Sequence, residues 1–195
     1  MELPFIPLDG RFLRLEPFGP GLKEEVRAAI DSDPAAWAVM PTNPTGAGFD
    51  DYWSAACRAP PNQRLVYAIR QTSDERLVGT STFYTYAAHL DAVEIGSTFL
   101  HPDVRAGVTN PETKLLMLDH AFAAGAIRVV FRVDTRNQRS QAAAAKLGAV
   151  REGVLRKDLP TWTGYIRDTA IFSILDDEWP AVRAKLEARI RAYAI

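Results

Sequence analysis

The sequence contains little of what builds disulfide-bonded, metal-binding or membrane-spanning proteins. Its single cysteine, Cys57, excludes an internal disulfide and a cysteine-based metal site. The three histidines are scattered without the spacing of metal ligands. No apolar run approaches the roughly 20 residues that span a bilayer, and the N-terminus lacks the basic stretch of a signal peptide. We therefore expect a soluble, cytoplasmic protein without a metal cofactor.

The chain also lacks an excess of charge of either sign. It has 23 Lys and Arg against 24 Asp and Glu, for a formal net charge of −1. Such a balance leaves no electrostatic footprint for nucleic acid or an anionic membrane, so we expect neither as a partner. With 195 residues, 47% of them hydrophobic, the chain is long enough for a sizeable core. We predict a single domain over residues 1–195.

The most informative segment lies in the C-terminal half. Arg128–Asp134 alternates and is rich in Val, which predicts a strand. Asn137–Leu147 is rich in Ala and is followed by Gly148, which predicts a helix with a glycine just past its end. Ala149–Asp158 resumes the spacing of a strand.

The start of this predicted helix carries polar and basic side chains. Asn137 is a good N-cap, because its side chain can accept from a free backbone N–H. Ser140 lies three residues on and shares its face. Arg136 and Arg139 add positive charge at the positive end of the helix dipole, which favours an anionic or polar ligand nearby. An ordinary capped surface helix is the alternative.

The rest of the chain predicts a mixed architecture. An antiparallel N-terminal sheet precedes alternating helices and strands, so we expect an α+β fold with a mixed, mostly antiparallel sheet flanked by helices. The last helix should span about 177–193 with Asp177 as its N-cap, and its apolar stripe either packs on the domain or forms a dimer interface. The other predicted strands are Arg11–Glu16, Arg64–Arg70, Arg76–Tyr84 and Asp91–Leu100, and the other helices are Leu22–Ile30, Phe49–Ala59 and one that begins at Asn110.

A second candidate site is the loop that precedes Asn110. A strand, a loop and a helix start follow one another here, and this arrangement gathers free N–H groups and a positive dipole end. Arg105 and Lys114 would add positive charge for a pyrophosphate, whereas Glu112 would oppose it.

Several motifs together resemble a known family. The run Asn137-Gln-Arg-Ser-Gln-Ala, the segments Lys146–Ala149 and Arg151–Gly153, and the stretch Gly164–Pro180 resemble the C-terminal half of GNAT-fold N-acetyltransferases, and most of all their RimJ/RimL-like branch. The resemblance implies a GNAT acyl-CoA N-acyltransferase fold. In that fold the two central strands splay apart, pantetheine lies between them, and an amine attacks the thioester of acetyl-CoA directly.

The resemblance also implies roles for individual residues. Ser140 would lie near the thiolate and Asn137 would hold a pantetheine amide. Glu94 is the candidate general base, with Gly96 and Thr98 expected on its face of the strand, and a solvated strand carboxylate is the alternative. The loop departs from the commoner family pattern because it has one glycine. The implied acetyl-CoA-binding residues are Phe99, Leu100, His101, Arg105, Gly107, Val108, Thr109, Asn110, Lys114, Asn137 and Ser140.

The acceptor is an amine, either a protein N-terminus or a small molecule. Trp37, Tyr84 and Tyr165 are candidate acceptor contacts, and a core position is the alternative for Trp37. Homodimers are common among the proteins that the sequence resembles. A different class of function is a catalytically weak or inactive GNAT-fold module that serves as a binding or regulatory partner.

Overall fold

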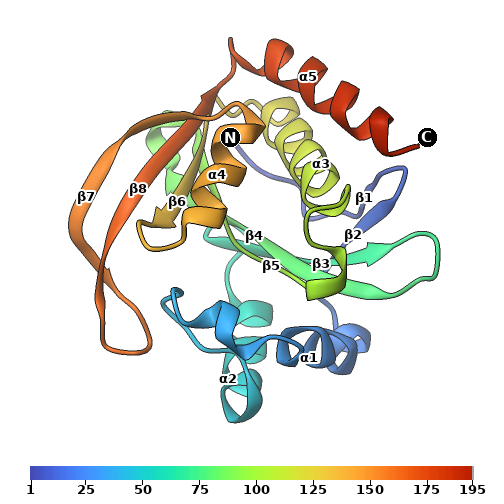
Figure 1. The fold of residues 1–195 in the computed structure, drawn as a ribbon, viewed down its shortest axis with the longest axis vertical. Coiled ribbons are helices and arrows are strands. Elements are labelled where there is room, and N and C mark those ends of the chain that lie inside the picture. Colours follow the sequence, from blue (N-terminus) through green and yellow to red (C-terminus); the bar gives the residue numbers. More distant parts are fainter. Residues whose placement is uncertain (195) are drawn as a thin grey trace.

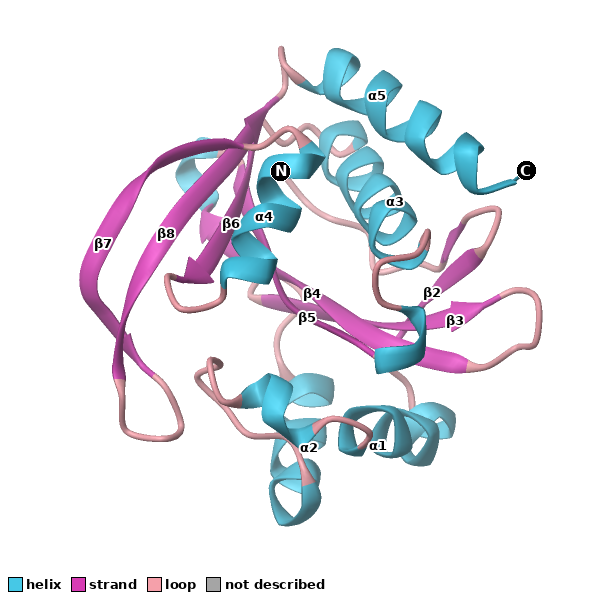
Figure 2. Cartoon of the chain, viewed as in Figure 1, coloured by secondary structure: helices cyan, strands magenta, loops and turns pink. Residues whose placement is uncertain are grey.

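The fold is built on one mixed eight-stranded sheet, shown in Figures 1 and 2. A computed structural model describes residues 1–194. The strand order is β1-β2-β3-β4-β5-β6-β8-β7, and every neighbouring pair is antiparallel except β5 and β6. The expected α+β class with a mostly antiparallel sheet is therefore confirmed. The strands are β1 (Leu8–Asp9), β2 (Leu13–Pro17), β3 (Arg64–Gln71), β4 (Leu77–Ala87), β5 (Ala92–Leu100), β6 (Arg128–Asp134), β7 (Val150–Pro160) and β8 (Ile166–Leu175).

Helices cover both faces of the sheet. Figure 1 shows α1 and α2 on one side and α3, α4 and α5 on the other. The α-helices are α1 (Lys23–Asp31), α2 (Phe49–Arg58), α3 (Thr109–Ala123), α4 (Gln138–Leu147) and α5 (Trp179–Arg191). Short 3-10 turns occupy Pro20–Leu22, Pro34–Trp37, Gly46–Gly48, Ala88–Leu90, Pro102–Val104 and Ala192–Ala194.

Helix α4 begins and ends where its sequence predicts. The side chain of Asn137 accepts a hydrogen bond from the Ser140 N–H at 3.0 Å, which satisfies one of the free donors of the first turn. Gly148 ends the helix at φ 103°, a left-handed conformation that glycine adopts without a Cβ clash.

The starts of the other two C-terminal helices differ from prediction. Helix α3 has Val108 as its N-cap rather than Asn110, because the Glu112 N–H donates to the Val108 carbonyl and closes the first turn. Helix α5 has Glu178 as its N-cap rather than Asp177. In both cases a proline at an early helical position fits, since the first N–H groups of a helix have no partner within it.

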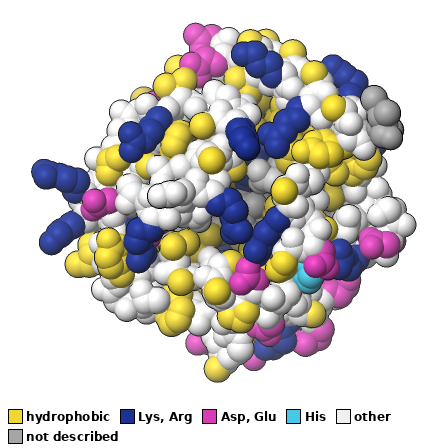
Figure 3. Space-filling view, in the orientation of Figure 1, with side chains coloured by type: hydrophobic (Ala, Val, Ile, Leu, Met, Phe, Trp, Pro, Cys, Tyr) yellow, Lys and Arg dark blue, Asp and Glu magenta, His cyan; other side chains and the backbone are white. Residues whose placement is uncertain are grey.

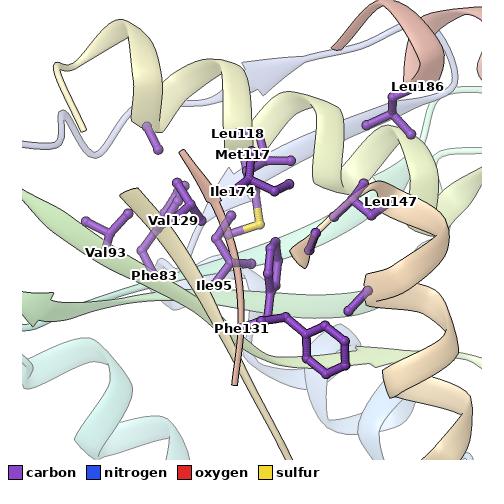
Figure 4. Close-up of a cluster of buried hydrophobic side chains, with 14 of the residues drawn as sticks. Phe83, Val93, Ile95, Met117, Leu118, Val129, Phe131, Leu147, Ile174 and Leu186 are labelled. Carbon is purple, nitrogen blue, oxygen red and sulfur yellow. The ribbon is translucent and has the colours of Figure 1, made fainter. Parts of the chain in front are cut away.

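The two faces of the sheet bury separate apolar clusters. Met117 and Leu118 of α3 pack near Ile174 of β8, as Figure 4 shows. The apolar stripe of α5 joins this cluster and lies against α3, so it packs on the domain. On the other face, α1 and α2 cover a cluster that contains Trp37 and Phe99. No helix within residues 1–194 is long and apolar enough to cross a membrane.

The parallel pair β5 and β6 separates early. Its pairing runs only from Ala92 opposite Arg128 to Glu94 opposite Val130, although both strands continue well beyond. The antiparallel neighbours β4 and β8 stay paired along the rest of each strand. The splayed central strands expected from the family resemblance are therefore present, and the β5 edge that faces the opening has no partner strand within the described residues.

A β-bulge lies on β5 at this opening. Ser97 has φ 45°, and the register with β4 shifts between the pairs Thr82–Gly96 and Thr80–Phe99. The extra residue turns Thr98 toward α3, where it meets Lys114, whereas Glu94 and Gly96 stay on the opposite face. The expectation that Thr98 shares the face of Glu94 is wrong for this reason.

Candidate active site

The opening between β5 and β6 leads into a cavity of about 430 Å³. Residues 95–98 line it from β5, and residues 131–134 line it from β6. The first turn of α4 contributes Asn137 and Ser140, and the start of α3 contributes Asn110 and Lys114. The cavity therefore joins the two helix starts that the sequence singled out.

The lining of this cavity is strongly basic, in contrast to the net charge of the whole chain. Within the described residues, Asp134 is the one acidic side chain that lines it. Figure 3 shows Lys and Arg side chains around the hollow on this face. An anionic ligand would be attracted here. The basic side chains of the lining are Arg105, Lys114, Arg132, Arg139, Lys146, Arg167 and Arg189.

The start of α3 has free backbone donors beside the cavity, and Asn110 among them belongs to the cavity lining. Within residues 1–194, the N–H groups of Val108, Thr109 and Asn110 donate no hydrogen bond. The single glycine of the loop, Gly107, therefore does not prevent several amides from being available for an anion. Glu112 does not oppose such an anion, because its carboxylate turns away to accept from the N–H groups of Arg11 and Phe12 at 2.7 and 2.9 Å.

Lys114 lies deeper on the same helix. Its ammonium donates to Thr98 Oγ1 at 2.6 Å and Ser81 Oγ at 3.3 Å, and it forms no ion pair within the described residues. Burial lowers the pKa of Lys114 to about 7. Arg105, by contrast, is paired with Asp33 at 2.6 Å and donates to the Leu100 carbonyl.

The α4 end of the cavity presents one donor and one hydroxyl. Because Asn137 Oδ1 is occupied by the Ser140 N–H, the amide Nδ2 is the group of Asn137 that remains for a ligand. The Ser140 hydroxyl has no hydrogen-bond partner within residues 1–194 and lines the cavity. Both residues are placed by the same capped turn, so their geometry is set together.

Glu94 lies beside the cavity at the point where the strands separate. It is the last paired position of β5 opposite β6, and its Oε2 lies 3.9 Å from Arg132 Nη1. Its carboxylate accepts no hydrogen bond within the described residues. Burial raises the pKa of the Glu94 carboxyl above its ordinary value, while the charges of Arg132 and Arg167 oppose that effect. A partly buried carboxylate without a hydrogen-bond donor in the described residues suits proton transfer.

Sequence comparison identifies the family. The acetyltransferase (GNAT) domain family matches residues 13–150 of the chain. The chain belongs to this GNAT acetyltransferase family. None of the curated proteins compared with it is significantly similar to it.

Solved structures of GNAT proteins share the fold. A "putative acetyltransferase" from T. thermophilus is 34% identical, with a TM-score of 0.85 over 97% of this chain and 99% of that one. A GCN5-related N-acetyltransferase from Brucella melitensis is 25% identical, with a TM-score of 0.89 over 97% of this chain and 87% of that one. RimJ from Mycobacterium smegmatis, in complex with CoA-disulfide, is 22% identical, with a TM-score of 0.80 over 97% of each chain.

The predicted site residues of this GNAT protein divide into two groups. The lining of the cavity includes Leu100, Arg105, Gly107, Asn110, Lys114, Asn137 and Ser140, and Glu94 lies directly beside it. Outside the lining lie Phe99, His101, Val108, Thr109, Trp37, Tyr84 and Tyr165.

The side chains outside the lining have other partners. Trp37 is 1% exposed and stacks on Phe99 at 5.3 Å, so it occupies the core position that the sequence left as an alternative. The Tyr84 hydroxyl bonds the Ser97 hydroxyl at 2.9 Å. Tyr165 is exposed, and the Arg136 guanidinium lies 3.7 Å from the centre of its ring.

Sequence reasoning missed most of the basic side chains in the cavity. Arg132 and Arg167 have the pattern of ordinary strand charges, and Lys146 and Arg189 that of ordinary helix charges. Arg167 forms no ion pair with its neighbour Asp168 within the described residues, because neighbours on a strand point to opposite faces. Asp168 accepts from the Lys157 N–H at 2.7 Å instead.

Proposed function

We propose that this GNAT protein is an acetyl-CoA-dependent N-acetyltransferase of the RimJ/RimL-like branch. It moves acetyl to an amine, either a protein N-terminus or a small molecule, by direct attack in a ternary complex. The observation that carries the proposal is the basic cavity between β5 and β6, which lies between the free N–H groups at the start of α3 and the partly buried carboxylate of Glu94. The CoA-disulfide bound to the RimJ structure supports CoA as the ligand of this fold.

The residues of the cavity suit each part of acetyl-CoA. The free N–H groups of residues 108–110 and the positive end of α3 would bind the pyrophosphate. Lys146 and Arg189 offer positive charge for the phosphate of CoA that is not part of the pyrophosphate. The unpaired edge of β5 beyond Glu94 would hydrogen-bond pantetheine as an added strand does, and Asn137 Nδ2 would donate to a pantetheine carbonyl.

The thioester supplies the activated acetyl group. Glu94 acts on the proton of the attacking amine, and Ser140 acts on the leaving thiolate. Glu94 accepts a proton from the amine, directly or through a water, as the new N–C bond forms. The C–S bond breaks and leaves a thiolate, to which Ser140 donates a hydrogen bond. Strands β5 and β6 hold the amine and the thioester next to each other, so that the amine attacks within one ternary complex.

The first test combines binding with turnover. Isothermal titration should show acetyl-CoA binding by the wild-type protein. Ser140→Ala and Asn137→Asp should each lower turnover by more than about tenfold. Asp at position 137 keeps an acceptor for the helix cap but loses the donor to pantetheine, so α4 should stay folded.

The control is Ser54→Ala on α2, outside the cavity, which should leave turnover unchanged. No detectable heat with acetyl-CoA would contradict the proposal. Binding without CoA release across a broad amine panel would instead support a binding or regulatory module. The free N–H groups at the start of α3 favour an active enzyme over a binding or regulatory module. They remain available to an anion although the loop has a single glycine.

A further inference from the structure

Arg167 of β8 is a buried cation with a free hydrogen-bonding edge. It is 5% exposed and lines the cavity. Its Nε donates to Thr169 Oγ1 at 3.1 Å, and its Nη1 lies 3.5 Å from the Val39 carbonyl oxygen. Within residues 1–194, Nη2 donates to no atom and the guanidinium forms no ion pair. A buried guanidinium normally meets an anion, because desolvating an unpaired charge is costly.

The acidic groups around Arg167 are engaged by other arginines. Asp134 binds Arg136, with Oδ2 2.6 Å from Arg136 Nη2, and these hydrogen bonds hold the pKa of Asp134 below its ordinary value although burial acts in the opposite direction. Asp158 binds Arg132 Nη2 at 2.5 Å. Glu94 is nearest to Arg132, at 3.9 Å.

The position of Arg167 relates it to the acceptor rather than to the phosphates of CoA. Its charge acts on Asp134 and Asp158, which other arginines engage, and also on Glu94, the proposed base. Val39, whose carbonyl oxygen lies 3.5 Å from Arg167 Nη1, and its neighbour Met40 come from the loop between α1 and α2, and both line the cavity. The free N–H groups that suit pyrophosphate lie on α3, which packs on the other face of the sheet. An anion bound to Nη2 would therefore belong to the amine that reaches Glu94.

We propose that the acceptor is an amine that also carries a carboxylate, such as a free amino acid, and that Arg167 binds this carboxylate through Nη2. This inference rests on the proposed acetyl transfer. A planar guanidinium matches the geometry of a carboxylate. A polyamine is disfavoured, because its additional cationic groups would lie close to Arg132 and Arg167.

The test compares each L-amino acid with its own carboxamide as acceptor, and CoA release is measured with a thiol reagent. The two members of a pair differ in the charge that Arg167 would bind and share the reacting amine. We expect kcat/KM to favour the acids by at least about tenfold, the size of one charge-assisted hydrogen bond. Arg167→Gln should remove this preference by raising KM for the acids, and Arg167→Lys should restore part of it.

Two controls accompany the variants. Arg183→Gln on α5 removes an exposed arginine that pairs with Asp119, and the preference should remain. Isothermal titration should show the same acetyl-CoA affinity for Arg167→Gln as for the wild type, because no CoA contact is assigned to Arg167. Thermal unfolding of Arg167→Gln and Arg167→Lys separates a folding defect from a binding defect.

Each other outcome has a defined meaning. Equal rates for acids and carboxamides, or an equal loss for both in Arg167→Gln, would overturn the inference and leave acetyl transfer standing. A preference for O-phosphoethanolamine over the acids would assign Arg167 to phosphate and overturn the carboxylate. Acetyl-CoA binding without reaction of any acid would overturn it too. Failure of acetyl-CoA to bind would remove the proposed function itself.

Discussion

At the scale of single residues, the proposed role of Glu94 as general base can be tested by its pH dependence. Its carboxyl is partly buried, and that burial raises its pKa. Because the base must be ionised to accept a proton, the acid limb of the kcat/KM profile should lie above the usual pKa of a glutamate. Glu94→Gln keeps the shape of the side chain but cannot accept the proton. We expect it to lower kcat about a hundredfold and to abolish this limb, measured by steady-state kinetics from about pH 5 to 9.

The matching control is Glu187→Gln, which changes an α5 carboxylate that pairs with Arg183 outside the cavity. Its pH profile should match the wild type. Wild-type kcat in Glu94→Gln would exclude Glu94 as the base.

The raised pKa of Glu94 also affects how the folding stability depends on pH. A raised pKa means that the folded state binds the proton more tightly than the unfolded state. This group therefore stabilises the fold at low pH, and that contribution is lost as pH rises through the folded pKa.

At the scale of elements, α3 carries a buried charge whose cost depends on pH. Lys114 has a folded pKa of about 7, against an ordinary value of 10.5. Between these values the unfolded chain binds a proton that the folded chain does not, so the free energy of unfolding should rise with pH. Lys114→Met should flatten this rise. Urea denaturation at about pH 6.5, 8 and 9.5 would measure both slopes.

The substitution leaves no orphaned hydroxyl, because Ser81 and Thr98 already bond each other at 2.7 Å. Lys185→Met on α5 is the control, since an exposed lysine should not change the slope. Parallel curves for the wild type and Lys114→Met would show that Lys114 keeps its proton in the folded state.

The elements also show how far the sequence predicts this structure. Strand β6 and helix α4 have the predicted bounds or lie within one residue of them, because their signals are local: alternation, the Asn137 cap and Gly148. The bulge at Ser97 had no local signal, since it depends on register with β4. The free edge of Arg167 could not be predicted either, because it arises from pairings among distant arginines and carboxylates.

At the scale of the whole molecule, hydrogen bonds between two connecting segments link the two sides of the opening between β5 and β6. The hairpin between β7 and β8 meets the loop between α1 and α2, which Figure 1 shows on the same side of the molecule. Trp162 Nε1 donates to the Trp37 carbonyl at 2.8 Å, and the Trp162 N–H donates to the Met40 carbonyl at 3.2 Å. This connection holds residues 39 and 40, which line the cavity at its proposed acceptor end.

Trp162→Phe would remove the indole donor and keep an aromatic ring at that position. We expect it to raise KM for the amine about two- to tenfold, the value of one neutral hydrogen bond, because residues 39 and 40 would lose part of their support. The dissociation constant for acetyl-CoA should stay unchanged, since its proposed contacts lie on α3, α4, α5 and β5. Steady-state kinetics and isothermal titration measure the two quantities separately. Trp179→Phe, a matched change on α5 outside the cavity, should leave KM for the amine unaltered. If Trp162→Phe weakened acetyl-CoA binding as much as amine binding, the connection would support the whole cavity rather than its acceptor end.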